Sequence, residues 1–310
     1  MASLLLSICS LILLAGLSSA ADSNPLECEI TGETATLYLA TDTEKTVITP
    51  ETTFDPAKPF FVIIHGWNEN STRVEYKDIA AELYLETNGT VVMVDYDEFA
   101  HKFYGTCAFI ISNTVGDFVT DFIVKRIDAG QIKHSQIHLI GHSLGGQIAG
   151  YIGRAVYDET EIKINRISAL DAAGPLFSVL VIPLPDISLS ADDAVIVDAL
   201  HTSLLLGALP RIGTIDFYVK GLLGLPILSA ACGLFSTLDA CSHALSVTLF
   251  RESIRSCGII ANHWIYWSRK IVYGFHMPIT ATGTYDIYPA FGPPYGKGDP
   301  DCSKIKQIGN

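Results

Sequence analysis

A five-residue run in the middle of the chain has the spacing of a nucleophile elbow. It reads Gly141-His142-Ser143-Leu144-Gly145 and directly follows an apolar run, residues 137–140. The serine of such an elbow sits on a tight turn between a strand and a helix, where glycines two positions before and after it allow the backbones to approach closely. A helix predicted from Leu144 to Tyr157 would direct its first N–H groups at an oxyanion. The run therefore predicts a nucleophilic serine at position 143.

A nucleophilic serine needs a base, which in hydrolases with this elbow comes last in the order serine, acid, histidine. His243, in Cys241-Ser242-His243, is the predicted base. His201 is its main competitor, although we favour a structural role for it. His243 would remove the proton of Ser143 and later protonate the leaving alcohol.

Asp171 is the predicted acid that orients this histidine. It ends the apolar run of residues 164–170 and precedes Ala172-Ala173-Gly174-Pro175, which turns the chain away. Asp198 and Asp216 are the alternatives. A carboxylate in this role holds the imidazole in the right tautomer and stabilises its cation.

The oxyanion formed when an ester is attacked needs backbone donors. One is expected from Leu144, directly after the serine, and a second from the loop that follows the first buried strand. That loop contains His65-Gly66-Trp67, and the N–H of Trp67 is the predicted donor.

The segments that must position these residues alternate between strand and helix patterns. The runs typical of buried strands are residues 60–64, 91–94, 137–140 and 164–170. Helical spacing covers residues 108–127, with an expected buried face of Phe109, Val115, Phe118, Val119, Phe122 and Ile123. This alternation predicts an α/β fold with a mostly parallel central sheet flanked by helices and with functional residues at the carboxyl ends of its strands. The later apolar segments, in which proline and glycine prevent the prediction of regular elements, are residues 176–189, 203–209 and 221–235.

The composition of the 310 residues fits a secreted globular protein. Residues 1–20 carry no charge and end in Ser18-Ser19-Ala20, so we expect them to be a signal peptide that is cleaved after Ala20 or Ala21. Residues 21–310 are predicted to form one catalytic domain. Hydrophobic residues make up 49% of the chain, enough for a large core, and the formal charge of -13 argues against nucleic acid as a partner.

Removal of the signal peptide leaves an even set of cysteines, which in an oxidising compartment predicts three disulfides of open pairing. They are Cys28, Cys107, Cys232, Cys241, Cys257 and Cys302. None has the paired spacing of a zinc site, so we expect no metal and no cofactor. Asn70 and Asn88 begin glycosylation sequons and are expected on the surface.

Motifs in order along nearly the whole mature chain resemble the landmarks of the pancreatic lipase family. They are FVIIHGW (61–67), VDY (94–96), IGHSLGGQ (140–147), LDAAGPLF (170–177), HT (201–202), IGTIDFY (212–218) and CSH (241–243). The resemblance implies an α/β-hydrolase fold and secreted ester hydrolysis on lipids. It also implies that Ser143, Asp171 and His243 form the triad, with Trp67 and Leu144 as oxyanion donors.

The chain departs from the family pattern in three respects. Ala172 stands where the family usually has proline, and Tyr96 where it often has tryptophan. Neither change is expected to abolish activity. The C-terminal β-sandwich that vertebrate digestive members use for colipase is missing, so we expect no colipase partner and a single-domain, insect-type member.

The lid of this family is a loop closed by two cysteines just before the catalytic histidine. Here Cys232 and Cys241 enclose eight residues, and so short a lid resembles the secreted phospholipase A1 branch. We therefore favour hydrolysis of the sn-1 ester of phospholipids at a membrane, micelle or droplet surface. A triacylglycerol or other neutral lipid lipase is one alternative, and a silent lipid-binding or yolk-type storage protein is the other. The disulfides that the family pattern implies are Cys28 with Cys107 and Cys232 with Cys241, which leaves Cys257 with Cys302.

The apolar stretch beside the lid, residues 221–228, has two possible roles. It is expected either to enter a lipid surface or to form a core strand or packed loop of the protein.

Overall fold

A computed structural model describes residues 28, 34–179, 182–184, 186–221, 232 and 239–304. The predicted signal peptide, residues 1–20, lies outside these residues. So do residues 233–238 of the predicted lid and residues 222–228 of the apolar stretch beside it.

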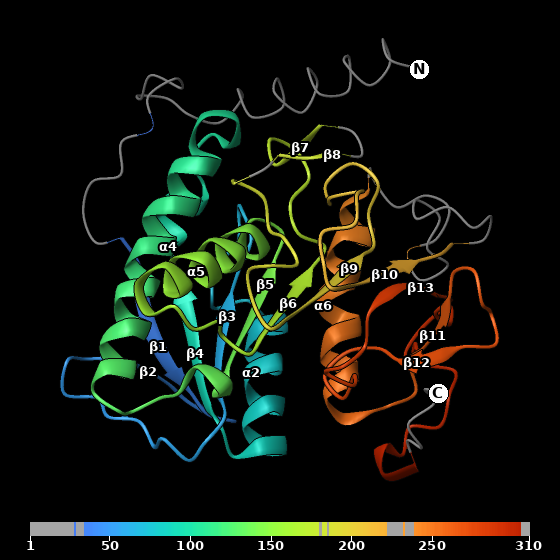
Figure 1. Ribbon diagram of the computed structural model, residues 1–310, viewed down its shortest axis with the longest axis horizontal. Coiled ribbons are helices and arrows are strands. Elements are labelled where there is room, and N and C mark those ends of the chain that lie inside the picture. Colours follow the sequence, from blue (N-terminus) through green and yellow to red (C-terminus); the bar gives the residue numbers. More distant parts are fainter. Residues whose placement is uncertain are drawn as a thin grey trace.

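The fold is built on one large sheet, in the strand order β12-β11-β13-β10-β9-β6-β5-β3-β4-β1-β2 (Figure 1). The parallel strands are β3 (Phe60–Ile64), β4 (Thr90–Asp95), β5 (Ile137–His142), β6 (Arg166–Leu170), β9 (Ile196–His201), β10 (Ile215–Val219) and β13 (Gly283–Ile287). The antiparallel strands at the two ends are β1 (Thr36–Ala40), β2 (Lys45–Val47), β11 (Ile260–His263) and β12 (Lys270–Val272). A separate hairpin pairs β7 (Ser178–Val179) with β8 (Ile182–Pro183). The predicted α/β class with a mostly parallel sheet is confirmed.

Helices cover both faces of the sheet. They are α2 (Val74–Thr87), the short α3 (Asp97–Ala100), α4 (Tyr104–Asp128), α5 (Leu144–Thr160) and α6 (Ala240–Arg255). Figure 1 shows α4 beside α5, and these two helices share one core layer with the sheet. α2 and α6 share the other layer. Along β3, Val62 and Ile64 join the first layer and Phe61 and Ile63 the second, which is why this strand is continuously apolar.

The buried face of α4 differs from the predicted one at Phe118. This side chain is 37% exposed, whereas Val115 and Val119 beside it are buried. α4 lies so close to α5 that a Cβ on Gly116 would be 2.3 Å from the ring of Tyr151. The side of α4 that contacts α5 therefore includes Gly116, and Phe118 faces solvent. α4 is also long and apolar enough to span a membrane by length and composition, but its buried row belongs to the core.

Candidate active site

Ser143 lies on the turn between β5 and α5, at the carboxyl end of the strand. Its backbone has φ 53° and ψ -121°, a strained conformation for a residue with a side chain. The flanking glycines are required because a Cβ on Gly145 would lie 2.2 Å from the carbonyl oxygen of Ile64. A Cβ on Gly141 would lie 2.2 Å from the carbonyl oxygen of Gly145. The elbow thus holds its serine on a turn that packs directly against β3.

Asp171 and His243 meet beside this turn, although they are 72 residues apart in the chain. Asp171 directly follows β6, and His243 lies in the first turn of α6. The imidazole Nδ1 lies 2.6 Å from the carboxylate Oδ2. Asp171 is fully buried, while 12% of the His243 side chain is exposed. A carboxylate at this distance fixes Nδ1 as the protonated nitrogen and leaves Nε2 free to act as a base.

Hydrogen bonds keep the buried carboxylate of Asp171 charged. The N–H of Thr202 donates to Oδ1 at 2.7 Å, and the hydroxyl of Ser203 donates to Oδ2. Burial alone would raise the pKa of Asp171, but the hydrogen bonds from its partners, His243 foremost, outweigh burial and lower it. The role of Ser203 could not be predicted from the sequence, because nothing about a serine in a loop indicates that the strand order will place it beside the acid.

Contacts made by neighbouring residues place the elbow of Ser143 beside His243 and Asp171. The ring of His142 lies 4.6 Å from that of His243, centroid to centroid. On the other side, the N–H of Ser143 donates to the carbonyl oxygen of Leu170 at 3.1 Å, next to Asp171. Among the described residues, no hydrogen bond joins the Ser143 hydroxyl to His243. Such contacts are often long in unliganded enzymes and shorten when substrate binds.

The two predicted oxyanion donors are the backbone N–H groups of Leu144 and Trp67. Leu144 begins α5, and Trp67 lies in the loop after β3. Neither N–H donates to an acceptor within the described part of the chain. Gly66 brings the loop against the serine, since a Cβ on it would lie 2.9 Å from the Cβ of Ser143. On its far side the loop is anchored by the indole Nε1 of Trp67, which donates to the carbonyl oxygen of Lys102 at 2.7 Å.

His65 and Tyr96 hold the start of this loop. The His65 Nδ1 donates to the carbonyl oxygen of Gly66 at 2.9 Å, and its Nε2 accepts the N–H of Tyr96 at 3.2 Å. The two rings stack with centroids 4.0 Å apart, and the hydroxyl of Tyr96 donates to the carbonyl oxygen of His65 at 2.5 Å. The tyrosine at position 96 therefore contributes a hydrogen bond to the oxyanion loop.

Glu69 links the oxyanion loop to the elbow, a role that was not predicted from the sequence. Its carboxylate accepts the N–H of Gly66 at 2.9 Å and lies 2.9 Å from the Nδ1 of His142. Tyr76 donates its hydroxyl to the same carboxylate, and Arg73 forms an ion pair with it. Burial alone would raise the pKa of Glu69, but these partners, His142 foremost, lower it far below its usual range. No motif marks this glutamate, because its partners come from α2 and from the end of β5.

The competing candidates make other contacts. The Nε2 of His201 lies 2.9 Å from Asp216, and its Nδ1 donates to the carbonyl oxygen of Ala208 at 2.7 Å. Asp198 forms a buried ion pair of 2.7 Å with Arg166. The structure thus brings Asp171, and neither alternative acid, to His243.

Disulfides join the six cysteines in the pairs that the resemblance implies. These are Cys28 with Cys107, Cys232 with Cys241, and Cys257 with Cys302. Among the described residues, one His/Cys group, that of Cys257, His276 and Cys302, is compact enough for a metal ion, but the disulfide takes both of its sulfurs.

The two predicted glycosylation sites differ in exposure. Asn88 is exposed at the end of α2. Asn70 is half-buried, with its amide 3.3 Å from Asp97.

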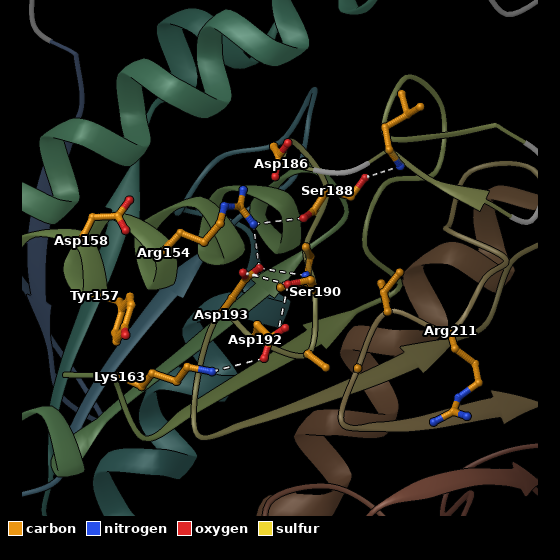
Figure 2. Close-up of a pocket in the computed structure, with 15 residues that line it drawn as sticks. Arg154, Tyr157, Asp158, Lys163, Asp186, Ser188, Ser190, Asp192, Asp193 and Arg211 are labelled. Atoms are coloured by element: carbon orange, nitrogen blue, oxygen red, sulfur yellow. Dashed lines mark hydrogen bonds and ion pairs between the residues drawn. The ribbon is translucent and has the colours of Figure 1, made fainter. Parts of the chain in front are cut away.

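A surface hollow of about 680 Å³ lies apart from Ser143, Asp171 and His243 (Figure 2). Figure 2 shows charged side chains from α5 and the neighbouring loops around it. Arg154 binds Asp193 at 2.8 Å, and Lys163 reaches Asp192 at 3.4 Å. Because none of the three predicted triad residues lines the hollow, it does not belong to the candidate active site.

Comparison with known proteins matches most of the chain to one family. The family model described as Lipase covers residues 31–262. The phospholipase A1 of Polybia paulista is 33% identical over 211 residues, covering 65% of this chain and 63% of that one. The probable phospholipase A1 magnifin of Vespa magnifica is 34% identical over 208 residues, covering 64% of this chain and 59% of that one. The hepatic triacylglycerol lipase of Homo sapiens is 33% identical over 224 residues, covering 66% of this chain and 44% of that one. The chain thus spans less than two thirds of the length of each of these relatives.

Proposed function

The chain belongs to the lipase family, and from this premise we propose that it is a secreted ester hydrolase that acts on lipids through an acyl-enzyme on Ser143. The observation that carries the proposal is the contact of 2.6 Å between Asp171 and His243 beside the strained serine. A base held by a buried, charged acid next to a nucleophile is the arrangement that acyl transfer needs. Secretion is supported by the three disulfides and by the uncharged apolar start of the chain.

In the proposed mechanism, the Nε2 of His243 takes the proton of Ser143 as its oxygen attacks the ester carbonyl carbon. The oxyanion that forms is stabilised by the N–H groups of Leu144 and Trp67. When the intermediate collapses, the bond to the alcohol breaks and His243 returns the proton to the departing oxygen. Water then attacks the acyl-enzyme with the same base, which releases the fatty acid and restores the serine. The carboxylate of Asp171 stabilises the imidazolium in both halves of the reaction.

For the substrate we propose the sn-1 ester of phospholipids. Support comes from the two wasp relatives named phospholipase A1 and from the eight residues between Cys232 and Cys241. A neutral lipid substrate is the second candidate, because the human relative of 33% identity is named a triacylglycerol lipase.

Fatty acid release from phosphatidylcholine, triolein and a galactolipid, measured in parallel, tests both levels of the proposal. We expect the sn-1 fatty acid of phosphatidylcholine to be released fastest, and Ser143→Ala to abolish release from every substrate. Faster release from triolein would favour the neutral lipid candidate. If no substrate is hydrolysed, the chain is not a lipid hydrolase and the lipid-binding or storage alternative takes its place.

A further inference from the structure

The turn between β11 and β12 exposes four large apolar side chains in succession. Trp264, Ile265, Tyr266 and Trp267 are 56%, 55%, 54% and 58% exposed. Two of the three tryptophans of the chain lie in this turn. The ring of Trp267 also stacks on that of Tyr288, with centroids 6.1 Å apart, which extends the patch onto the end of β13. Exposed apolar patches of this kind mark interaction sites.

Hydrogen bonds hold this turn in one shape. The Nδ1 of His263 accepts the N–H groups of Ile265 at 3.2 Å and Tyr266 at 3.1 Å. Arg269 closes the turn, because its N–H donates to Tyr266 at 2.7 Å and its carbonyl accepts the N–H of His263 at 2.9 Å. The apolar side chains are therefore presented on an ordered turn, so little conformational entropy is lost when they bind.

The charge beside these side chains is positive in a chain of net charge -13. Arg269 and Lys270 are both exposed, and the guanidinium of Arg269 lies 4.9 Å from the ring centroid of Tyr266. Residues 260–272 contain no aspartate or glutamate. The acid on the neighbouring strand, Asp286, is paired with Lys220 at 3.4 Å. Amphipathic aromatic rings with cations beside them fit the headgroup layer of a phospholipid bilayer, where the rings enter the interface and the cations meet phosphates.

Strand pairing separates this turn from the candidate active site. One row of paired residues crosses the sheet through His142, Leu170, Leu200, Phe217, Tyr285 and His263. Its five strand spacings place His263 roughly 24 Å from the elbow along the sheet. A substitution in the turn therefore changes no group that binds or orients the reacting atoms.

We propose that the aromatic turn, defined as residues 264–267 with Arg269 and Lys270, docks the protein onto a phospholipid bilayer. The proposal rests on the proposed function, since a lipid hydrolase of this kind must bind a membrane in which its substrate is packed. The aromatic turn would contact the membrane at a second place, separate from Ser143, where the ester is bound.

Binding to phosphatidylcholine vesicles, measured with Ser143→Ala so that no lipid is consumed, tests the docking by itself. Co-sedimentation is expected with the Ser143→Ala chain, together with a blue shift of its tryptophan fluorescence. Adding Trp264→Ala and Trp267→Ala should weaken binding about tenfold or more, since two large side chains lose their burial. The matched control, Phe118→Ala on the exposed side of α4, should bind as before. Equal binding by both variants, or no binding by any, overturns the proposal.

A second readout separates docking from catalysis. With Ser143 intact, the double tryptophan variant should hydrolyse vesicle phosphatidylcholine about tenfold more slowly, yet cleave a water-soluble short-chain ester at the unchanged rate. Equal losses on both substrates overturn the docking role. So does a tryptophan-dependent dimer in sedimentation, because a second copy would then cover the turn. Failure of the proposed function would look different, since neither ester would be cleaved while vesicle binding was retained.

Discussion

At the scale of single residues, the candidate site depends on two buried carboxylates that remain charged. Asp171 orients the base, and Glu69 ties the oxyanion loop to the elbow. Burial opposes the charge on both, and hydrogen bonds from their partners restore it, aided at Glu69 by the cationic Arg73. Each carboxylate can be tested by a substitution that removes its charge.

Asp171→Asn should lower kcat on a short-chain ester by about four powers of ten, because an amide holds the imidazole in the wrong tautomer. Initial rates across a range of pH measure this effect. Asp192→Asn is the control, since that side chain is 96% exposed and remote from the elbow, and it should leave kcat unchanged. A loss of less than about tenfold in Asp171→Asn would mean that another acid serves His243.

The lowered pKa of Asp171 predicts a particular loss of stability in acid. A carboxyl group whose pKa is lower in the folded chain stabilises the fold fully above its unfolded pKa, about 3.9, and loses that contribution as the pH falls through the folded value. Urea unfolding between pH 7 and pH 3 should therefore show a steeper fall in the free energy of unfolding for the wild type than for Asp171→Asn. Parallel curves would contradict the role of this carboxylate in stability.

Glu69→Ala should lower the free energy of unfolding by about 3 kcal/mol, because it leaves the N–H of Gly66 and the side chain of Tyr76 without their buried acceptor. Glu75 is the matched control. It pairs with the same Arg73 but is 41% exposed, so Glu75→Ala should change stability by no more than about 0.5 kcal/mol. Equal losses of unfolding free energy for Glu69→Ala and Glu75→Ala in urea denaturation would contradict the structural role of Glu69.

At the scale of elements, the elbow works because α5 begins in contact with β3. Gly145→Ala would put a Cβ 2.2 Å from the carbonyl oxygen of Ile64 at the end of that strand and 2.5 Å from that of His65 just after it. The helix must therefore move and carry the Leu144 N–H with it. We expect loss of most activity and a lower melting temperature. Gly292→Ala is the control, since nothing lies within 4 Å of a Cβ there. Full activity in Gly145→Ala would contradict this account of the elbow.

The elements that could be predicted are those whose pattern matches their burial. β3 is apolar at every position because it is buried on both faces, and the sequence identifies it as a strand. α4 is identified as a helix, but its buried row is not, since Gly116 brings α5 close and Phe118 then faces solvent. The contact with α5 decides which side of α4 is buried, and the periodicity of the α4 sequence alone does not reveal that contact.

At the scale of the whole molecule, the alternation of strand and helix patterns along the chain predicts the fold class, and the spacing of glycines around Ser143 predicts the serine elbow. The partners of these residues are less predictable. Ser203 and Glu69 reach the site because nonadjacent segments are brought together by the strand order, and strand order is a tertiary property. The aromatic turn lies at one end of the same sheet, where its exposure could not be inferred from its apolar composition.

Covalent labelling by a fluorophosphonate reports whether Ser143 is an activated nucleophile. The mature chain, treated with a fluorophosphonate and digested, should yield a single modified peptide with the label on Ser143 by mass spectrometry. Ser143→Ala should remove the label, and His243→Ala should slow its formation by several powers of ten, because the base is lost. An unlabelled Ser143 in the folded chain, or a label on another serine, would contradict the account.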